Sequence, residues 1–518
     1  MPPYAEAAEA LLRETAEDSF GDFSPSVYET ARVMRYAPSL AGQSRRLQFL
    51  LEQQRAGGEW GESPEYALLP TLSAIEALLF VLLRAQIGPE TAAMTDSVNR
   101  GFKTLFGWLN TGPTPDLPDT VAVELAVPGL IRAINDRLAA GPAAGLDAWR
   151  GRRLADHPGD RRALLDILRG ELLLGTAPPP KLLHSLEIFG AAAHAAPGVR
   201  PSAGAVGCSP AATAVWLGDA AVRAGRHPGV RYLHRAGRDG GVPVAGPLAT
   251  FERAWVLVAL ATAGLVPPVA DALVDNLEAA FGEHGVAAGP GLPPDADDTA
   301  AALHALALLG RPRSPACLLG YRDGDHFACF PPERTPSTST NAHVLQAFGA
   351  SAPARHRGER AVLTAWLCGQ QDPAGYWRDK WHASPYYATA CCVAALAGHG
   401  EPLPEAALRR AARWVFATQR TDGSWGRWRG TYEETAYAVR ILATVPVPEA
   451  GPALAAGSSA LRRLAGGPHP PLWHDKDLYT PVRIVRAEGL AALHLAEVRR
   501  RGDRPGRVAG EARPGGAR

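Results

Sequence analysis

The sequence lacks an excess of charge of either sign and lacks a paired cysteine motif, and each absence excludes a class of protein. Among 518 residues, 53 Lys and Arg balance 52 Asp and Glu, which gives a formal net charge of +1. A protein held to nucleic acid by phosphate contacts needs a clear basic excess, so we expect no nucleic-acid partner. The six cysteines form no C-x-x-C pair, which argues against a zinc finger and favours reduced thiols.

Long hydrophobic runs and a targeting segment are also missing. The longest apolar run, residues 254–266, is shorter than the ~18–20 residues of a membrane-spanning helix, so we expect no membrane span. The N-terminal segment is acidic and has no basic region followed by an apolar one, unlike a signal peptide. Hydrophobic residues make up 46% of the chain and charged residues 20%, which is typical of globular proteins. These features predict a cytoplasmic protein of several domains.

A repeated motif, Q-x-x-x-G-x-W, organises the chain. Its three copies lie at residues 54–60, 371–377 and 419–425. In the second half, Phe327, Trp377, Trp425 and Trp473 follow one another at spacings of 50, 48 and 48 residues. Because β-branched alternation is absent, this period predicts one helical hairpin per repeat and an all-α fold.

Six such hairpins between residues 235 and 495 would close into an α/α barrel with alternate helices inside and outside. The stretches 299–310, 389–398 and 435–443 are rich in small residues, as inner helices that crowd a centre must be. An open helical solenoid is the alternative, and the period alone does not exclude it. The first half has one copy of the motif and then loses the period, which indicates a second, less regular helical barrel.

Three aspartates, Asp295, Asp297 and Asp298, stand directly before an Ala- and Leu-rich segment. One or two of them could be explained by helix capping and by the helix dipole. Three carboxylates beside an apolar inner helix repel one another, so one of them should keep its proton. In an aromatic pocket such a general acid could protonate an alkene, and the π faces would stabilise the resulting cation.

The D-A-D-D string and the Q-x-x-x-G-x-W repeats resemble the class II terpene cyclases over roughly residues 22–490. The strings that resemble the diterpene branch include LLHSLE at 182–187, DKWHASPYYATA at 379–390, GTYEETAYAV at 430–439 and LWHDKDLYTPVRIVRA at 472–487. The resemblance implies two α/α barrel domains, called β and γ in this family. It implies a β domain of residues 1–40 and 239–498, a γ domain of residues 41–238, and a disordered basic tail at 499–518.

The resemblance also implies roles for individual residues. Asp297 would be the general acid that protonates the terminal alkene of a prenyl diphosphate, with Asp295 and Asp298 orienting it. A polar side chain one barrel helix away should bond to this acid, and His343 or Asn341 stands there; a core histidine without a role is the alternative for His343. Predicted substrate-binding residues are Lys476, Arg483, Lys380, Trp381, Tyr386, Tyr387, Trp425 and Tyr432, although a salt bridge is the simpler explanation for each cation.

The ionising motifs of class I terpene synthases, D-D-x-x-D and N-D-x-x-S-x-x-x-E, are absent from the sequence. We therefore expect the diphosphate to survive the reaction and a separate class I terpene synthase to use the product. The resemblance implies Mg²⁺ as the cofactor that holds the diphosphate. Glu59, Glu62 and Glu65 lie in the first half, but an exposed acidic loop explains them equally well, so the sequence identifies no metal ligand.

One position departs from the family pattern. In plant members, a His of an L-H-S string and an Asn of a V-P-N string position the water that takes the last proton; here His184 is present and Val244 replaces the Asn. Product skeleton and stereochemistry therefore stay open, including rearranged halimadienyl and clerodienyl types. The predicted function is cyclisation of geranylgeranyl diphosphate to a copalyl-type diphosphate. The alternatives are a drimenyl-type synthase acting on farnesyl diphosphate, a squalene-type cyclase and a non-catalytic helical-repeat binding protein.

Overall fold

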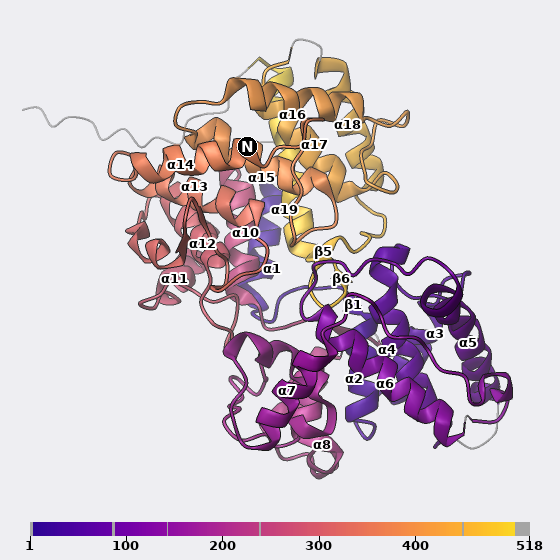
Figure 1. The fold of residues 1–518 in the computed structure, drawn as a ribbon. Helices are drawn as coiled ribbons and strands as arrows, with labels where there is room; N and C mark the ends of the chain where they lie inside the picture. The colour runs from indigo at the N-terminus through magenta and orange to yellow at the C-terminus, as the bar shows by residue number, and fades with distance from the viewer. Residues whose placement is uncertain (1–3, 85–88, 142, 238–239, 448–449, 503–518) are drawn as a thin grey trace, which may run out of the picture.

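Two rings of helices, one above the other in Figure 1, form the molecule. The computed structural model describes residues 4–84, 89–141, 143–237, 240–447 and 450–502. The upper lobe contains the first helix together with the second half of the chain, and the lower lobe contains the segments between them. Each ring has its own buried hydrophobic cluster.

The larger ring, called the large ring below, is a closed α/α barrel. Its inner helices are α10 (Ala249–Thr262), α12 (Ala296–Leu308), α13 (Thr338–Ser351), α15 (Pro385–His399), α17 (Tyr432–Thr444) and α19 (Val482–Arg500). Each packs on the next, and α19 returns to pack on α10. The outer elements are α1 (Ala5–Glu17), α11 (Asp271–Ala279), η5 (Pro315–Tyr321), α14 (Arg357–Gly369), α16 (Glu405–Ala417) and α18 (Ala450–Leu464). The barrel, and not the open solenoid, is therefore the observed arrangement.

The second ring, called the small ring, is less regular. Its inner elements are α2 (Val27–Tyr36), α4 (Pro64–Leu82), α6 (Val123–Ala140), the 3₁₀ segment η3 (Pro180–Ala193) and α8 (Pro210–Ala224). The outer helices are α3 (Gln43–Glu52), α5 (Pro89–Phe106), α7 (Arg162–Leu173) and α9 (Pro228–Ala236). Because α2 packs on α4 and α8, the chain crosses between rings before residue 27, earlier than the boundary at residue 40 that we expected.

Three two-residue antiparallel strand pairs link the loops. They are β1 (Pro25–Ser26) with β2 (Val242–Pro243), β3 (Arg322–Asp323) with β4 (His326–Phe327), and β5 (Trp473–His474) with β6 (Leu478–Tyr479). The pair β1–β2 joins the two crossings of the chain between the rings. The C-terminal segment differs from the expected tail, since α19 continues to Arg500; residues 503–518 lie outside the described residues.

Helix α4 is the one helix in the described part of the chain that is long and apolar enough to cross a membrane by length and composition. Its mean hydropathy is 1.6 in an 18-residue window, and 83% of that window is buried inside the protein. The sequence analysis overlooked this segment because Glu65 and Glu76 interrupt its apolar run. Its burial at the centre of the small ring accounts for its apolar composition.

The Q-x-x-x-G-x-W motif fastens an outer helix to an inner one. In the copy at 419–425, the Trp425 indole N–H donates to the Val415 carbonyl (2.7 Å), and the Trp425 amide donates to the Thr435 hydroxyl (3.0 Å). The Gln419 amide donates to the Gly423 carbonyl (3.0 Å). The other two copies make the same three bonds at 2.7–3.0 Å.

The glycine of this motif is required by the backbone. Gly58, Gly375 and Gly423 have φ of +96°, +110° and +83°, a region that side chains disfavour. A Cβ atom at any of them would lie 2.5–2.8 Å from a backbone oxygen of the following outer helix. The motif is therefore a packing device, and it occurs in both rings.

Candidate active site

The three aspartates lie at the start of inner helix α12. Asp295 is the N-cap residue, in an extended conformation, and its Oδ1 accepts the backbone N–H of Asp298 (2.8 Å). Asp297 and Asp298 occupy the first helical turn, and all three side chains are buried. Capping thus explains Asp295, but it does not explain why two further carboxylates are buried beside it.

His343 on the neighbouring inner helix α13 contacts Asp297 directly. Its Nδ1 lies 2.7 Å from Asp297 Oδ1, and the two side chains are 11% and 13% exposed. The Trp255 ring meets the imidazole edge-on, with ring centroids 5.3 Å apart. Asn341 stands two residues earlier on α13 and does not reach the acid: its side chain bonds to the backbone of Phe327 (2.8 and 3.0 Å). Of the two predicted partners, only His343 contacts Asp297.

Burial dominates the electrostatics of the aspartates. It raises the pKa of Asp295 to about 7, against the lowering effect of its hydrogen bonds with Asp298, and burial together with the charge of Asp295 raises the pKa of Asp298 well above its usual range. Burial alone would lower the pKa of His343, but the charge and hydrogen bond of Asp297 raise it well above its usual value. The cluster therefore holds protons at neutral pH.

A pocket of about 380 Å³ lies between the two rings, with Asp295, Asp297 and Asp298 in its wall. The aromatic residues that line it are Phe251, Trp255, Phe330, Trp381, Tyr387, Trp473 and Tyr479. The small ring contributes Glu124, Lys181 and His184 among others. The pocket thus joins a buried, aromatic region around the aspartates to a charged edge on the small ring.

The edge of the pocket carries both signs of charge. Lys181 is exposed, and its Nζ donates to the carbonyl of Pro332 (3.1 Å). Arg334 forms an ion pair with Asp119 and lies 3.6 Å from Glu124. Of these four charged residues, Lys181 and Glu124 line the pocket, and nothing in the local sequence of Glu124 places it there.

His184 lies in the pocket wall, held by two acceptors. Its Nδ1 donates to the carbonyl of Gly207 (2.7 Å), and its Nε2 lies 2.9 and 3.2 Å from the two carboxylate oxygens of Asp475. Burial lowers the pKa of His184, but Asp475 more than compensates and the net shift is upward. Asp475 also lines the pocket, whereas Val244 is fully buried away from it. The partner of His184 in this chain is therefore Asp475, a residue the sequence analysis missed.

Comparisons with known proteins agree with this arrangement. The squalene–hopene cyclase C-terminal domain family matches residues 327–456. An ent-copalyl diphosphate synthase from Streptomyces sp. (strain KO-3988) is 46% identical over 503 residues, covering 94% of this chain and 95% of the relative. The chain belongs to the bacterial class II diterpene cyclases.

Two further relatives have similar identity, and one of them is named for a different product. Labda-7,13-dienyl diphosphate synthase from Streptomyces clavuligerus is 45% identical over 532 residues, covering 96% of this chain and 95% of the relative. The solved structure of ent-copalyl diphosphate synthase from Streptomyces platensis has a TM-score of 0.89 at 45% identity, covering 96% of this chain and 100% of that chain. Because relatives named for different products are equally similar, identity alone does not indicate the product of this cyclase.

Three of the predicted substrate-binding cations of this cyclase form ion pairs with carboxylates away from the pocket. Lys476 is buried between the rings and bonds to Glu29, Glu187 and Ser209. Arg483 pairs with Glu252 (2.8 Å) and Asp18 (3.2 Å), and Lys380 pairs with Glu333. None of the three is among the described residues that line the pocket, and their ion pairs agree with the salt-bridge explanation that we considered for each cation. Each neutralises a carboxylate that would otherwise be buried alone.

Of the five predicted aromatic residues, Trp381 and Tyr387 line the pocket and three do not. The Tyr386 hydroxyl bonds to Thr418 (2.9 Å), and its ring packs on Trp414. Trp425 is fully buried in the packing motif, and Tyr432 packs on His469. Consecutive side chains of an α-helix point about 100° apart, so Tyr387 can enter the pocket while Tyr386 packs on Trp414 beside it.

The acidic loop considered for metal binding is engaged in ion pairs. Glu62 pairs with Arg55 (2.8 Å) and lies 3.7 Å from Arg429, and Glu65 pairs with Arg427. In the described part of the chain, no group of three or more His, Cys, Asp or Glu side chains is arranged to hold a metal ion. A metal cage made by the protein alone is thus absent from those residues.

Proposed function

We propose that this cyclase converts geranylgeranyl diphosphate into a bicyclic, copalyl-type diphosphate by protonating the terminal alkene and keeping the diphosphate. The observation that carries this proposal is the contact of Asp297 with His343 inside an aromatic pocket that has Lys181 at its edge. The relatives described above are named as synthases of diphosphates of this type. Neither of them is named for a farnesyl or squalene substrate.

Asp297 serves as the general acid. The His343 Nδ1–H occupies Oδ1, so Oδ2 is left to carry the proton that is transferred. When that proton leaves, the histidine stabilises the new carboxylate through a charge-assisted hydrogen bond. Asp295 and Asp298 support this step by holding a proton of their own, since two more negative charges would oppose proton loss at Asp297.

The pocket walls stabilise the carbocation that forms on protonation. The faces of Trp255, Tyr387 and Trp473 supply negative electrostatic potential without a nucleophile that would trap the cation. The aliphatic and aromatic lining also limits the access of water to the ring-forming end of the pocket. Each new ring forms when an alkene of the substrate attacks the preceding cation. The protein therefore has to hold the prenyl chain of the substrate in a folded conformation and exclude water from it.

Mg²⁺ is the cofactor we propose for the diphosphate end. Mg²⁺ usually keeps several waters and is bound through one or two carboxylates plus substrate phosphates, so a site completed by the substrate needs no protein cage. Glu124, which lines the pocket, would hold the ion together with the substrate phosphates, and the ion would neutralise diphosphate charge there. Lys181 at the same edge binds and orients the diphosphate by charge.

The last proton is lost near His184. Both ring nitrogens of His184 face acceptors, so the ring is already protonated and is a poor base. The carboxylate of Asp475 takes the proton: the C–H electrons form the exocyclic or ring alkene, and the C–O bond to the diphosphate stays intact. His184 positions this carboxylate. His184 thus does not act alone as the base, because Asp475 is its partner.

The retained diphosphate defines the next step in the pathway. A diphosphate ester with a bicyclic skeleton must be consumed by an enzyme that ionises that C–O bond, which is the class I terpene synthase reaction. We expect this cyclase to act in the cytoplasm, where water-soluble prenyl diphosphates are made and used.

One experiment tests the function. The purified protein is incubated with Mg²⁺ and geranylgeranyl diphosphate, farnesyl diphosphate or squalene, and products are identified before and after phosphatase treatment. We expect a bicyclic alcohol from geranylgeranyl diphosphate only after phosphatase, with no release of inorganic diphosphate. A product from farnesyl diphosphate or squalene alone would contradict the substrate, and released diphosphate would contradict the reaction type.

A further inference from the structure

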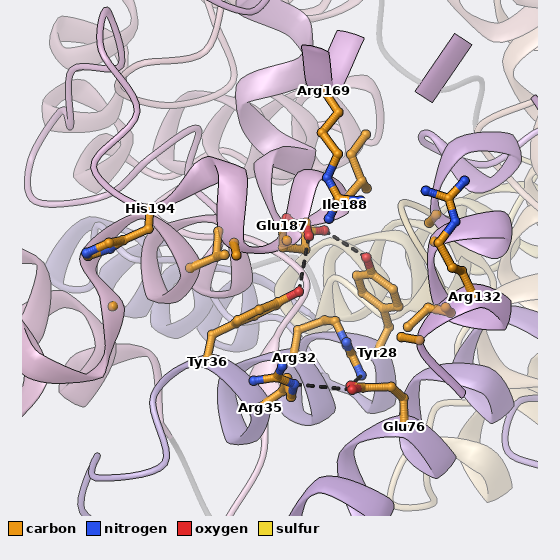
Figure 2. A pocket seen from close by; sticks show the side chains of 18 of the residues that line it. Tyr28, Arg32, Arg35, Tyr36, Glu76, Arg132, Arg169, Glu187, Ile188 and His194 are labelled. Carbon is orange, nitrogen blue, oxygen red and sulfur yellow. Dashed lines mark hydrogen bonds and ion pairs between the residues drawn. The ribbon is translucent and has the colours of Figure 1, made fainter. Parts of the chain in front are cut away.

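The small ring encloses a second cavity, of about 580 Å³, that is separate from the pocket between the rings. Figure 2 shows its walls, which come from α2, α4, α6, α7, η3 and α8. None of the residues assigned above to acid catalysis, cation stabilisation or diphosphate binding lines it. Its lining contains many charged side chains. The cyclisation described above gives this cavity no role.

A buried carboxylate in this wall has an oxygen with no donor. The Glu187 side chain is 0% exposed, and its Oε1 accepts bonds from the Tyr28 hydroxyl (2.9 Å) and Lys476 Nζ (3.0 Å). Within the described residues, Oε2 has no hydrogen-bond partner. Leaving a buried acceptor unsatisfied is costly, so this oxygen indicates that something in the cavity donates to it.

A guanidinium lies beside that carboxylate. Figure 2 shows the Arg169 guanidinium and the Tyr36 hydroxyl directed toward the Glu187–Ile188 segment. Arg169 Nε donates to the Phe189 carbonyl (3.1 Å), and within the described residues its two terminal nitrogens make no hydrogen bond. The space next to them is kept open by Gly190, whose φ is +58°.

The glycine matters because any other residue would occupy that space. A Cβ atom on Gly190 would lie 3.0 Å from Arg169 Nη2 and 3.8 Å from the Tyr36 hydroxyl oxygen. On the opposite side, Arg35 uses its Nε for Glu76 (3.2 Å) and is one-third exposed, so it supplies a second positive charge at the opening. The cavity therefore combines guanidinium donors with carboxylate acceptors, since Glu76, Asp136 and Asp219 line it as well as Glu187.

We propose that this cavity is a second small-molecule site, for an anion that also carries a hydroxyl or amino donor. The anionic group, a phosphate or a carboxylate, binds Arg169, because a guanidinium group matches the geometry of both anions, and Arg35 adds positive charge at the opening. The donor group binds Oε2 of Glu187 once this carboxylate, whose side chain is 0% exposed, has turned toward the cavity. A ligand with only one of the two groups would leave the other half of the site unsatisfied.

The site shares a residue with the contact between the rings. Glu187 binds Lys476, the residue after Asp475, and Asp475 holds His184 in the catalytic pocket. A ligand that donates a hydrogen bond to Glu187 therefore alters the electrostatic potential at Lys476 and Asp475. Its binding should for this reason change the rate of turnover. This part of the inference rests on the proposed function; binding itself does not.

Isothermal titration of the full-length protein tests binding. The probes are glycerol 3-phosphate, glycerate and glycerol, which separate phosphate, carboxylate and hydroxyl recognition. We expect one of the two anions to bind and glycerol to fail. Arg169→Gln, which removes the charge, and Ala133→Leu, which fills the cavity from α6, should each weaken binding about tenfold or more.

Two further variants locate the binding. Arg150→Gln removes an exposed arginine elsewhere in the small ring, and Lys181→Gln removes a cation at the catalytic pocket; neither should change the affinity. No heat with either anion at millimolar concentration, or equal affinity in the folded Arg169→Gln protein, overturns the site. If Ala133→Leu fails to fold, Arg169→Gln alone decides.

Turnover measurements test the coupling. Saturating anion should change the cyclisation rate at least twofold in the wild type and leave Arg169→Gln unchanged. An unchanged wild-type rate overturns the coupling. A protein that binds the anion but cyclises no prenyl diphosphate contradicts the proposed function and not the site, so the two failures are distinguishable.

Discussion

Two buried ionic clusters of this cyclase both contain aspartate and histidine, but they shift the pKa of an aspartate in opposite directions. The acid cluster (Asp295, Asp297, Asp298, His343) has one cationic partner for three carboxylates, and burial raises the pKa of Asp295 to about 7. The interface cluster (Glu29, Glu187, Asp475, Lys476, His184) has a lysine and a histidine. There, although burial raises the pKa of Asp475, His184 and Lys476 bring it below its usual value.

The difference shows that the count of nearby cations, and not burial alone, decides whether a carboxyl keeps its proton. Glu29 makes the same point within the interface cluster. It shares Lys476 with Glu187, and burial still raises its pKa to about 7, because one ammonium does not compensate two buried glutamates. A general acid needs the first kind of cluster, whereas a stable joint between two rings needs the second.

The sharpest way to break the acid cluster is Asp297→Asn. The amide is isosteric but cannot donate the acid proton, so we expect turnover to fall by ~10²–10⁴ while the fold and substrate binding persist. Product formation and thermal unfolding measured on the same preparation check this. Retention of more than about a hundredth of the rate would remove Asp297 from the role of general acid.

Breaking the interface cluster should cost stability instead of chemistry. Lys476→Met leaves Glu29 and Glu187 buried without their cation, and we expect a loss of ~3–5 kcal/mol in the free energy of unfolding. Lys380→Met, which removes a lysine paired with a single glutamate nearer the surface, is the matched control and should cost less. Denaturant unfolding of both variants gives the comparison, and equal losses would contradict it.

Removing the histidine of the acid cluster should slow the reaction less than removing the acid. His343→Phe deletes the hydrogen bond that stabilises the Asp297 carboxylate, a charge-assisted bond worth ~1.5–3 kcal/mol, so kcat should fall about 10- to 150-fold. KM should change little, since His343 is one helix away from the edge of the pocket. A core histidine without a catalytic role would lower the melting temperature and leave kcat unchanged.

The contributions of Asp295 and Asp475 to folding stability should change with pH in opposite directions. Because the folded pKa of Asp295 is raised to about 7, its contribution to stability is full below the ordinary Asp pKa of about 3.9 and is lost as pH rises through about 7. Because that of Asp475 is lowered, its contribution is present above about 3.9 and is lost as pH falls through the lower, folded pKa.

Activity should follow the acid cluster. We expect kcat/KM to decline above about pH 7, and Asp295→Asn, which keeps the helix cap but cannot titrate, should remove or displace that decline. A pH–rate profile of both proteins tests this. An identical alkaline decline in the variant would mean that another group controls it.

The smallest effect on rate is expected at the histidine of the interface cluster. His184→Ala leaves protonation by Asp297 intact but releases Asp475 from its partner, so the product distribution should shift toward water-quenched or hydride-shifted skeletons. Asp475→Asn should shift it as well. The same product profile in a folded His184→Ala enzyme would show that His184 only packs between the rings.

The repeats and the aspartates gave most of the fold and the acid site in advance. The 48-residue period with an aromatic residue in each copy predicted the barrel, because the motif fixes one outer helix to one inner helix. Asp297 could be named because it stands at the start of an apolar inner helix, whereas His343 was named, with Asn341 as the alternative, through the family resemblance. Their contact at 2.7 Å is what adjacent inner helices produce.

The cations and the second carboxylate could not be predicted from the sequence. Lys476 and Arg483 lie in strings that resemble the family, but whether a cation faces substrate or a buried glutamate depends on residues hundreds of positions away. The same holds for Asp475 and His184, which are 291 positions apart. Local pattern reveals which residues are unusual, and only the packing of the two rings reveals what they touch.

The placement of α1 has a consequence for synthesis on the ribosome. This helix packs against α10 and α19, so its place in the large ring is complete only when both of these later helices have been made. The core of the small ring needs no segment beyond α8 and α9, whereas the helices on which α1 packs begin more than 200 positions later. We expect the small ring to form its core first during synthesis, and the catalytic barrel to close only when α19 is available.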